Sequence, residues 1–198
     1  MNIVDHQIKR LAMGEVPHEI RSFYSFSLSI ELPKEVLPMV SPFDPMAVKP
    51  DTLLNPASLD IRVGNHADLL TNDGWKEIDL SFYTKENPFT ILPYPADRIL
   101  VSSLETFNIP NFLTCTFKLK SSRGREFYEH LHAGFADPGW YGSKLTMELV
   151  NFNTEPLPLY PGLKIGQFAF TLTFGLPDFD YSKTGRYNND TGAARSRG

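Results

Sequence analysis

Cysteine is almost absent from this sequence, since Cys115 is the only one among 198 residues. A single cysteine cannot form an internal disulfide or supply a cysteine-rich zinc site, and it suits a reducing compartment, so we expect a cytoplasmic protein. Long apolar stretches are missing too. No run approaches the roughly 20 residues that span a bilayer, and the first residues, MNIVDHQIKRLAMGE, lack the apolar core of a secretory signal. We therefore expect no membrane role.

Excess positive charge is also missing. The formal net charge is −4, from 19 lysines and arginines against 23 aspartates and glutamates. This balance argues against a general surface for polyanions and leaves room for a local basic pocket, so nucleic acid is not an expected partner. The chain also lacks a Walker loop, a GxGxxG turn, a GxSxG elbow and the HxE with PCxxC set of zinc deaminases. We expect no zinc site.

Turn residues, in contrast, are plentiful. The 16 prolines and 13 glycines are spread among short apolar runs rather than gathered in one tract. This spacing is typical of a chain that turns often, and it favours an all-β body. We predict a single domain over residues 1–198, because neither side of the proline-rich segment 32–56 looks self-sufficient. That segment is predicted to be an extended surface loop.

The first elements are predicted from periodicity. Apolar residues recur at helix spacing between Val4 and Ala12, which predicts a short helix that Asp5 caps and Gly14 ends. From Phe23 to Ile30, aromatic and aliphatic residues alternate with serine, which predicts a strand.

Most of the remaining chain is predicted to form short strands. SLDIRVGN is interpreted as a strand closed by a glycine turn, and ILPYPADRILVSSLETFNIP as two strands around a proline-rich bend. Clean alternation predicts strands over residues 114–120, 143–152 and 165–174, each with one apolar face. Many short strands suggest a barrel or a folded double sheet. The polar tail after Phe174 is expected to be mobile on its own.

Two basic segments are candidates for binding an anion. KLKSSRGRE carries four cationic side chains within eight residues, beside two hydroxyls. Such groups and the N–H groups of a turn can cradle a polyphosphate, but a solvated basic loop has the same composition. The tail is basic as well and contains Tyr181 and Tyr187. It either closes over an anionic, aromatic ligand or is a disordered C-terminus.

Glu148 is the sharpest single candidate, because it lies in the middle of a predicted strand between apolar neighbours. A carboxylate there is costly to bury unless it is paired or used, so Glu148 is either functional or a glutamate on the barrel exterior that faces water. Residues 133–142, AGFADPGWYG, are typical of a tight hairpin. His130 and His132 share a strand face, but without a third ligand nearby we expect satisfied or exposed histidines rather than a metal site.

Taken together and in order, several segments resemble the dCTP deaminase branch of the dUTPase-like superfamily. They are VDHQI, SLDIRVGN, KSSRGRE, AGFADPGWYG, MELVN, PGLKIGQFAF and GRYNNDTG. The resemblance covers most of the chain apart from residues 31–55. It implies an all-β (mainly β) subunit, a distorted β-barrel or jelly-roll of the dUTPase-like type, with a short N-terminal helix and a flexible C-terminal lid at 181–198. It also implies a homotrimer with active sites between subunits, dCTP or dUTP as ligand, and Mg²⁺ carried by the triphosphate rather than by a metal site of the protein.

The resemblance implies roles for individual residues. Glu148 matches the glutamate that shuttles protons while the cytosine amino group is removed, and Ser121 and Arg125 match the serine and arginine of the pattern RSSxxR. These three are the predicted catalytic residues, with Arg125 positioning the glutamate while Ser121 and the backbone around Ala133 hold the water. The predicted substrate-binding residues are Lys120, Ser122, Arg123, Gly124, Ala133, Asp137, Trp140, Thr146, Met147, Gln167, Tyr181, Arg186 and Asp190.

The chain departs from the family pattern in ways that leave the preferred base open. Lys120 stands where RSSxxR has arginine, Asp190 stands where the tail usually has glutamine, and the interval from Arg125 to DPGW is slightly short. The leading hypothesis is zinc-independent deamination of dCTP to dUTP and ammonia. One alternative is a diphosphatase that releases pyrophosphate from dUTP or dCTP, with Asp137 orienting the water, alone or together with deamination. The other is a non-catalytic, nucleotide-binding regulator.

Overall fold

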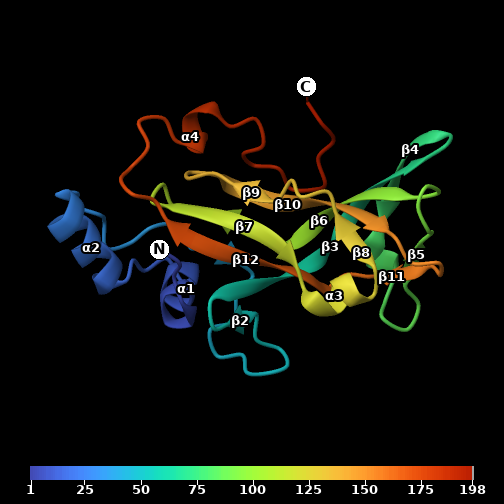
Figure 1. The fold of residues 1–198 in the computed structure, drawn as a ribbon, viewed down its shortest axis with the longest axis horizontal. Coiled ribbons are helices and arrows are strands. Elements are labelled where there is room, and N and C mark those ends of the chain that lie inside the picture. Colours follow the sequence, from blue (N-terminus) through green and yellow to red (C-terminus); the bar gives the residue numbers. More distant parts are fainter. Residues whose placement is uncertain (198) are drawn as a thin grey trace.

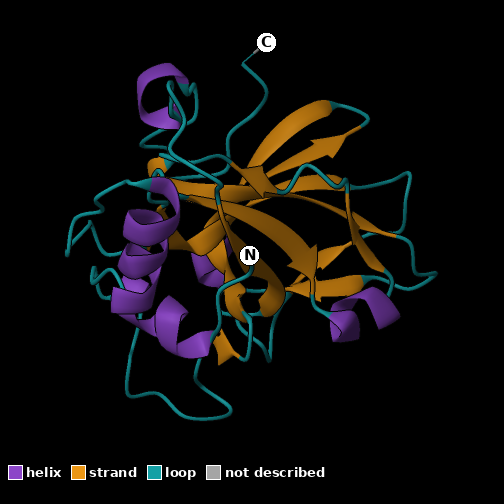
Figure 2. Ribbon diagram, turned by 60° about the vertical axis from the view of Figure 1, so that its left-hand side comes forward, coloured by secondary structure: helices purple, strands orange, loops and turns teal. Residues whose placement is uncertain are grey.

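The computed structural model describes residues 1–197, so Gly198, the last residue of the predicted domain and lid, lies outside the described residues. Figures 1 and 2 show strands that curl into an open, barrel-like body with helices around it. This confirms the predicted mainly β fold. The strands are β1 (Val40–Ser41), β2 (Leu54–Asn55), β3 (Ser58–Thr71), β4 (Gly74–Asp79), β5 (Phe89–Ile91), β6 (Arg98–Asn108), β7 (Leu113–Leu119), β8 (Tyr128–His130), β9 (Phe135–Ala136), β10 (Tyr141–Asn151), β11 (Leu157–Leu159) and β12 (Lys164–Leu172). The helices are α1 (Asp5–Ala12), α2 (His18–Leu28), α3 (Ser121–Arg125), α4 (Tyr181–Thr184) and the 3₁₀ turn η1 (Leu80–Phe82).

The main sheet is organised around the long strand β3. Its central path runs β8-β10-β6-β3-β12-β7-β9, and β1, β2 and β4 pair with strands of that path. The first part of β3, residues 59–62, pairs with β12, whereas residues 67–70 pair with β6. The pairing with β6 is irregular between Val63 and Ala67, and such an irregularity bends a strand and increases its twist. One strand therefore joins the two halves of the curled sheet.

Gly64 lies inside this irregular stretch. The glycine turn expected after SLDIRVGN is wrong, because β3 continues to Thr71. A Cβ atom at Gly64 would lie only 2.4 Å from the carbonyl oxygen of Ser103 on β6. Glycine is therefore required here for the close approach of two strands rather than for a turn.

The alternation of β10 gives each of its faces a separate role. Leu145, Met147 and Leu149 are buried in the core, which confirms the predicted apolar face. The core-facing phenylalanines of β12, Phe168 and Phe170, are fully buried beside them in the same core. Burial of one such side chain contributes about 1.5–3 kcal/mol. The apolar face thus fixes β10 in place and leaves the opposite face, with Glu148, free to form a site.

The N-terminal region contains two helices instead of the predicted helix and strand. The helix at Asp5–Ala12 is confirmed, with Ile8 and Leu11 buried. The strand predicted from Phe23 to Ile30 is wrong, because this segment mostly belongs to α2. Residues four apart in an alternating pattern also satisfy helix spacing, and Ile20 and Tyr24 are buried one helical turn apart in this way. The pattern alone did not separate the two structures.

The proline-rich segment 32–56 is mostly loop, as predicted, with only the short strands β1 and β2 inside it. No helix in the described part of the chain is long and apolar enough to cross a membrane.

Candidate active site

A cavity of about 470 Å³ opens between β10, β6, the segment 133–140 and the C-terminal tail. Figure 1 shows the tail, in red, passing over β9 and β10. Aromatic and aliphatic groups make up much of the wall, together with carboxylates and one ammonium group among the described residues. The lining residues are Trp75, Leu100, Ala133, Phe135, Ala136, Asp137, Trp140, Lys144, Leu145, Thr146, Glu148, Tyr181, Tyr187, Asp190, Ala194 and Ser196.

Glu148 lies on the cavity face of β10, opposite Leu100 of β6. Thr146 shares this face, whereas Met147 and Leu149 on either side of Glu148 point into the core. The side chain is half-buried, and no ion pair to it occurs within residues 1–197. Burial raises the pKa of the Glu148 carboxyl, and a hydrogen bond from its own backbone opposes this only in part. Such a carboxyl can both hold and release a proton at the wall of a cavity.

Asp137 and Trp140 reach the cavity through the turn that joins β9 to β10. The Trp140 N–H donates to the Asp137 carbonyl at 3.2 Å, and Gly139 takes a left-handed φ of 84°. The hairpin predicted for this segment is wrong, because β9 pairs with β7 whereas β10 pairs with β6 and β8. The turn instead links two strands that do not pair with each other. It leaves the Asp137 carboxylate exposed on the cavity wall.

The tail covers one side of the cavity. The Tyr187 carbonyl accepts hydrogen bonds from the Trp140 indole at 3.0 Å and from the Ser143 hydroxyl at 2.7 Å. The Asp190 carbonyl accepts from the Lys144 N–H at 2.7 Å. These bonds bring Tyr187 and Asp190 to the lining, with Tyr181 nearby. The described tail residues lie over a cavity, while closure over an anionic, aromatic ligand remains a prediction.

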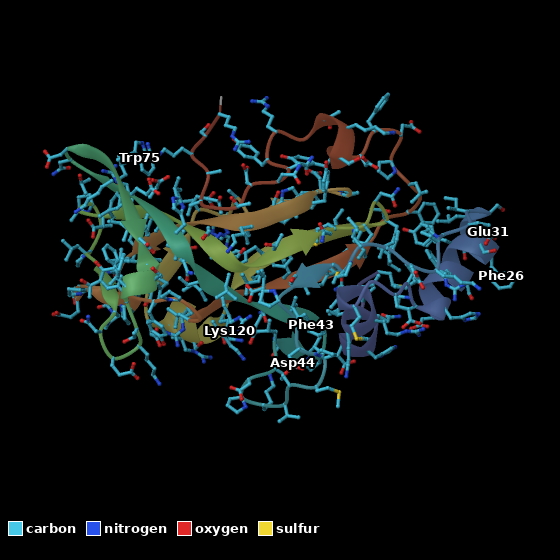
Figure 3. The ribbon with its side chains drawn as sticks, turned by 180° about the vertical axis from the view of Figure 1, so that it is seen from behind. Phe26, Glu31, Phe43, Asp44, Trp75 and Lys120 are labelled. Atoms are coloured by element: carbon cyan, nitrogen blue, oxygen red, sulfur yellow. The ribbon has the colours of Figure 1, made fainter. Side chains whose placement is uncertain are left out.

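The predicted residues of the basic segment lie elsewhere. Lys120 precedes α3 and donates to the buried Asp60 carboxylate at 2.5 Å, and Arg123 pairs with Glu126. Figures 1 and 2 agree that α3 lies on the side of the sheet away from the tail, and Figure 3 labels Lys120 on that side. Within the described chain, none of the residues 120–125 lines the cavity. One chain therefore does not bring Ser121 and Arg125 to Glu148.

Three further predicted residues are placed away from the cavity lining. Gln167 of β12 accepts a hydrogen bond from Ser58 at 2.9 Å, on the strand that pairs with β7. Met147 is a core residue, so that only its backbone is near the site. Arg186 is exposed, and its carbonyl accepts from Arg197. In contrast, Ala133, Asp137, Trp140, Thr146, Glu148, Tyr181 and Asp190 meet at one cavity.

Sequence reasoning missed Trp75 and Lys144 as lining residues. Lys144 could have been predicted, because it lies on the same face of β10 as Glu148. Trp75 lies on β4, outside the recognised motifs, and the residue remains 42% exposed. A tryptophan on an otherwise polar hairpin was the signal available for it.

Metal-ligating side chains do not gather in the described structure, where no cluster of three or more histidine, cysteine, aspartate or glutamate residues occurs. The His130 and His132 rings are 5.1 Å apart, with Glu129 near His132 at 3.7 Å. Burial lowers the pKa of His130, and the neighbouring His132 adds to this. His130 instead packs edge-on against Phe117 in the core.

Comparison with known proteins gives this geometry a family context. A family model described as dCTP deaminase-like matches residues 39–173. A protein of Corynebacterium efficiens named "dCTP deaminase, dUMP-forming" is 31% identical over 173 residues, covering 80% of this chain and 85% of the relative. A protein of the same name from Tropheryma whipplei is 37% identical over 147 residues, covering 69% of this chain and 71% of the relative.

One solved structure supports the fold. The 2′-deoxycytidine 5′-triphosphate deaminase of Agrobacterium tumefaciens aligns with a TM-score of 0.56 at 16% identity, over 87% of this chain. The chain spans about half of that longer protein, 48%. At this identity the likeness concerns the fold alone.

Proposed function

Because this chain belongs to the dCTP deaminase-like family, we propose that it converts dCTP to dUMP. The balanced reaction uses two water molecules and releases ammonia and pyrophosphate. The observation that carries the proposal is the half-buried Glu148 carboxyl, which lies without a cationic partner of the described chain on the wall of a largely apolar cavity. The relatives' names favour dUMP, so dUTP, the product of the leading sequence hypothesis, becomes an intermediate rather than the end of the reaction.

Glu148 supplies the proton transfers of deamination. Its carboxyl protonates N3 of cytosine, which makes C4 electrophilic, and the resulting carboxylate takes a proton from the water that attacks C4. The same proton then passes to the amino group, and the C4–N bond breaks to release ammonia. As ammonia leaves, the C4 hydroxyl returns its proton to the Glu148 carboxylate, which forms the C4 carbonyl and restores the protonated carboxyl. Burial raises the pKa of Glu148 and so favours the protonated form relative to an exposed glutamate, which suits a group that must first donate a proton.

The second hydrolysis breaks the bond between the α- and β-phosphates. Asp137 is exposed on the same cavity wall, where its carboxylate can orient a water molecule for attack on phosphorus. Of the three carboxylates at the cavity, Glu148 and Asp137 therefore offer a general base to each end of the nucleotide. The alternative in which Asp137 acts alone, as in a dCTP or dUTP diphosphatase, gives dCMP from dCTP and no ammonia.

A second copy of the chain completes the site in this proposal. Lys144 is the only cationic residue among the described lining, which is little for a triphosphate. Ser121 and Arg125, in contrast, are exposed, and no hydrogen bond or ion pair joins either side chain to the rest of residues 1–197. In the homotrimer that the family resemblance implies, α3 of one copy reaches the cavity of another. Arg125 then faces Glu148 and the phosphates of the bound nucleotide.

Mg²⁺ is proposed to arrive with the triphosphate. The residues at hand suit this hard cation, since Asp137 presents its carboxylate at the cavity, and Asp190, whose Oδ1 pairs with Arg197, has a buried Oδ2 without a hydrogen-bond partner in the described chain. Bound to the phosphates, Mg²⁺ neutralises part of their charge. Asp137 and Asp190 would contact it from the protein side.

The proposal is tested by incubating the purified protein with dCTP and Mg²⁺, separating the nucleotides by ion exchange and assaying ammonia and pyrophosphate in parallel. dUMP with equal amounts of ammonia and pyrophosphate is the expected result. dUTP with ammonia alone would reduce the activity to deamination, and dCMP with pyrophosphate alone would make the protein a diphosphatase. Nucleotide binding without any product would show the non-catalytic regulator instead.

A further inference from the structure

The last part of the tail is fixed to β3 and β10 by hydrogen bonds from its backbone. The Ala193 N–H donates to His66 Nδ1 at 2.8 Å, and the Ala194 N–H donates to the Thr146 hydroxyl at 2.9 Å. Thr146 and Ala194 both line the cavity. The tail therefore bridges the two strands at the rim of the candidate active site, beyond residue 173, where the family match ends.

The next residue, Arg195, makes the strongest contact of this segment. Its Nε and Nη2 atoms donate to the two carboxylate oxygens of Asp68 at 3.0 and 2.7 Å. The guanidinium carbon lies 5.1 Å from the centre of the Trp75 ring, a cation–π distance. The Asp68 side chain is only 7% exposed, whereas that of Arg195 is 46% exposed. A nearly buried carboxylate that accepts two hydrogen bonds from one planar guanidinium group binds arginine specifically.

We infer that Asp68 and Trp75 form an anchor for Arg195 that holds the tail closed over the cavity. Asp68 touches no residue assigned here to the chemistry, so it is a positioning residue that acts through Arg195. Closing the tail keeps Tyr187, Asp190 and Ala194 at the lining and limits the access of water. The effect on turnover rests on the proposed function, but the anchoring itself does not.

Tryptophan fluorescence can report on the contact between Arg195 and the anchor. Its 2 tryptophans both contact the tail, since Trp75 lies under Arg195 and the Trp140 indole donates to Tyr187. Figure 3 labels Trp75 near the end of the tail. In a Trp140→Phe background, Trp75 is the sole tryptophan, so tryptophan emission comes from the ring beneath Arg195, and it is compared among variants without nucleotide and without turnover.

The test compares Asp68→Asn, Arg195→Gln and Arg195→Lys with Asp73→Asn. The control removes the same charge from the exposed tip of the same hairpin, where the Asp73 side chain has no hydrogen bond or ion pair within residues 1–197. We expect the first three variants to shift Trp75 emission in the ligand-free protein and the control to leave it unchanged. Lysine should not restore the contact, because it cannot bind both carboxylate oxygens at once.

Steady-state kinetics of the same variants distinguish a role of Asp68 in positioning the tail from a role in stability alone. Loss of the anchor should raise KM for dCTP about tenfold with kcat nearly unchanged, since bound nucleotide must then supply the free energy of closure. The double variant Asp68→Asn/Arg195→Gln should be no worse than either single variant. Unchanged emission and KM, additive effects, or a fall in kcat at constant KM with a lowered Tm would overturn the anchor. Absence of turnover in the parent protein would instead refute the proposed function and leave the fluorescence result standing.

Discussion

The cavity and the basic segment 120–125 differ in how many of their polar groups find partners within one chain. At the cavity, β10, the turn 137–140 and the tail are joined by a continuous set of hydrogen bonds, and the lining residues of β10 and the tail include half-buried Thr146, Glu148 and Tyr187. In the basic segment, the ion pairs formed within residues 1–197 are those of Lys120 and Arg123, while Ser121, Ser122 and Arg125 are exposed. The first region is organised by its own chain, and the second presents free donors outward.

A similar contrast separates two glutamates on the paired strands β10 and β6. Glu105 is completely buried, and it accepts from Arg62 Nε at 2.6 Å and from the Arg62 N–H at 3.0 Å. Glu148 is half-buried and has no cationic partner within the described chain. A satisfied carboxylate of this kind stabilises the fold, whereas an unpaired one at a cavity is available for chemistry. The predictions below test this distinction.

Replacement of Glu148 should have the largest effect. Glu148→Gln keeps the shape of the side chain but removes the proton carrier, so ammonia release from dCTP should fall about 10²- to 10⁴-fold. Nucleotide binding, measured by calorimetry, should be retained. Glu86→Gln, on an exposed loop, is the matched control. Ammonia release by Glu148→Gln at the parent rate would remove Glu148 from the mechanism.

Arg125→Ala should reduce turnover about 10²-fold, because it removes a charged donor from the reacting centre. The sharper measurement is co-expression of Arg125→Ala with Glu148→Gln under separate tags. If one copy supplies Arg125 and another Glu148, random mixing restores about a quarter of the sites. Activity that stays at the level of the single variants would mean that both residues act within one chain.

Glu105→Gln should act on stability rather than on chemistry. The change leaves Arg62 without its anionic partner, and we expect a loss of about 2–3 kcal/mol in the free energy of unfolding. This is less than the 3–5 kcal/mol for a fully buried pair, because Arg62 is 26% exposed. Urea titration at neutral pH gives the free energy of unfolding. The catalytic rate constant kcat is measured at a urea concentration far below the unfolding transition, where the protein is folded. A large fall in kcat without a change in stability would contradict the distinction.

The same contrast explains what the sequence allowed us to predict. Strands such as β10 and β12 could be predicted because a half-buried strand repeats every two residues, and Glu148 was noticeable as a carboxylate within such a strand. The helix α2 was missed, since its serines and aromatic residues satisfy both periods. Trp75 could not be tied to the site, because only the pairing of β4 with β3 brings it to the cavity. The motifs identified seven residues that meet at the cavity, but they did not show that Ser121 and Arg125 lie away from it within one chain.

The smallest expected effect concerns pH and follows from the raised pKa of Glu148. Burial makes the folded protein hold this proton more tightly than the unfolded chain does, whose glutamate pKa is about 4.3. The contribution of Glu148 to stability is therefore fully present below the unfolded pKa and is lost as pH rises through the folded pKa. Glu148→Gln cannot ionise, so its Tm relative to the parent should increase as pH rises from the unfolded pKa through the folded one, and Glu86→Gln serves as the exposed control. A difference that stays flat or decreases would mean that the Glu148 carboxylate already has a partner in the folded protein, and the unpaired carboxyl that distinguishes Glu148 from Glu105 would then be lost.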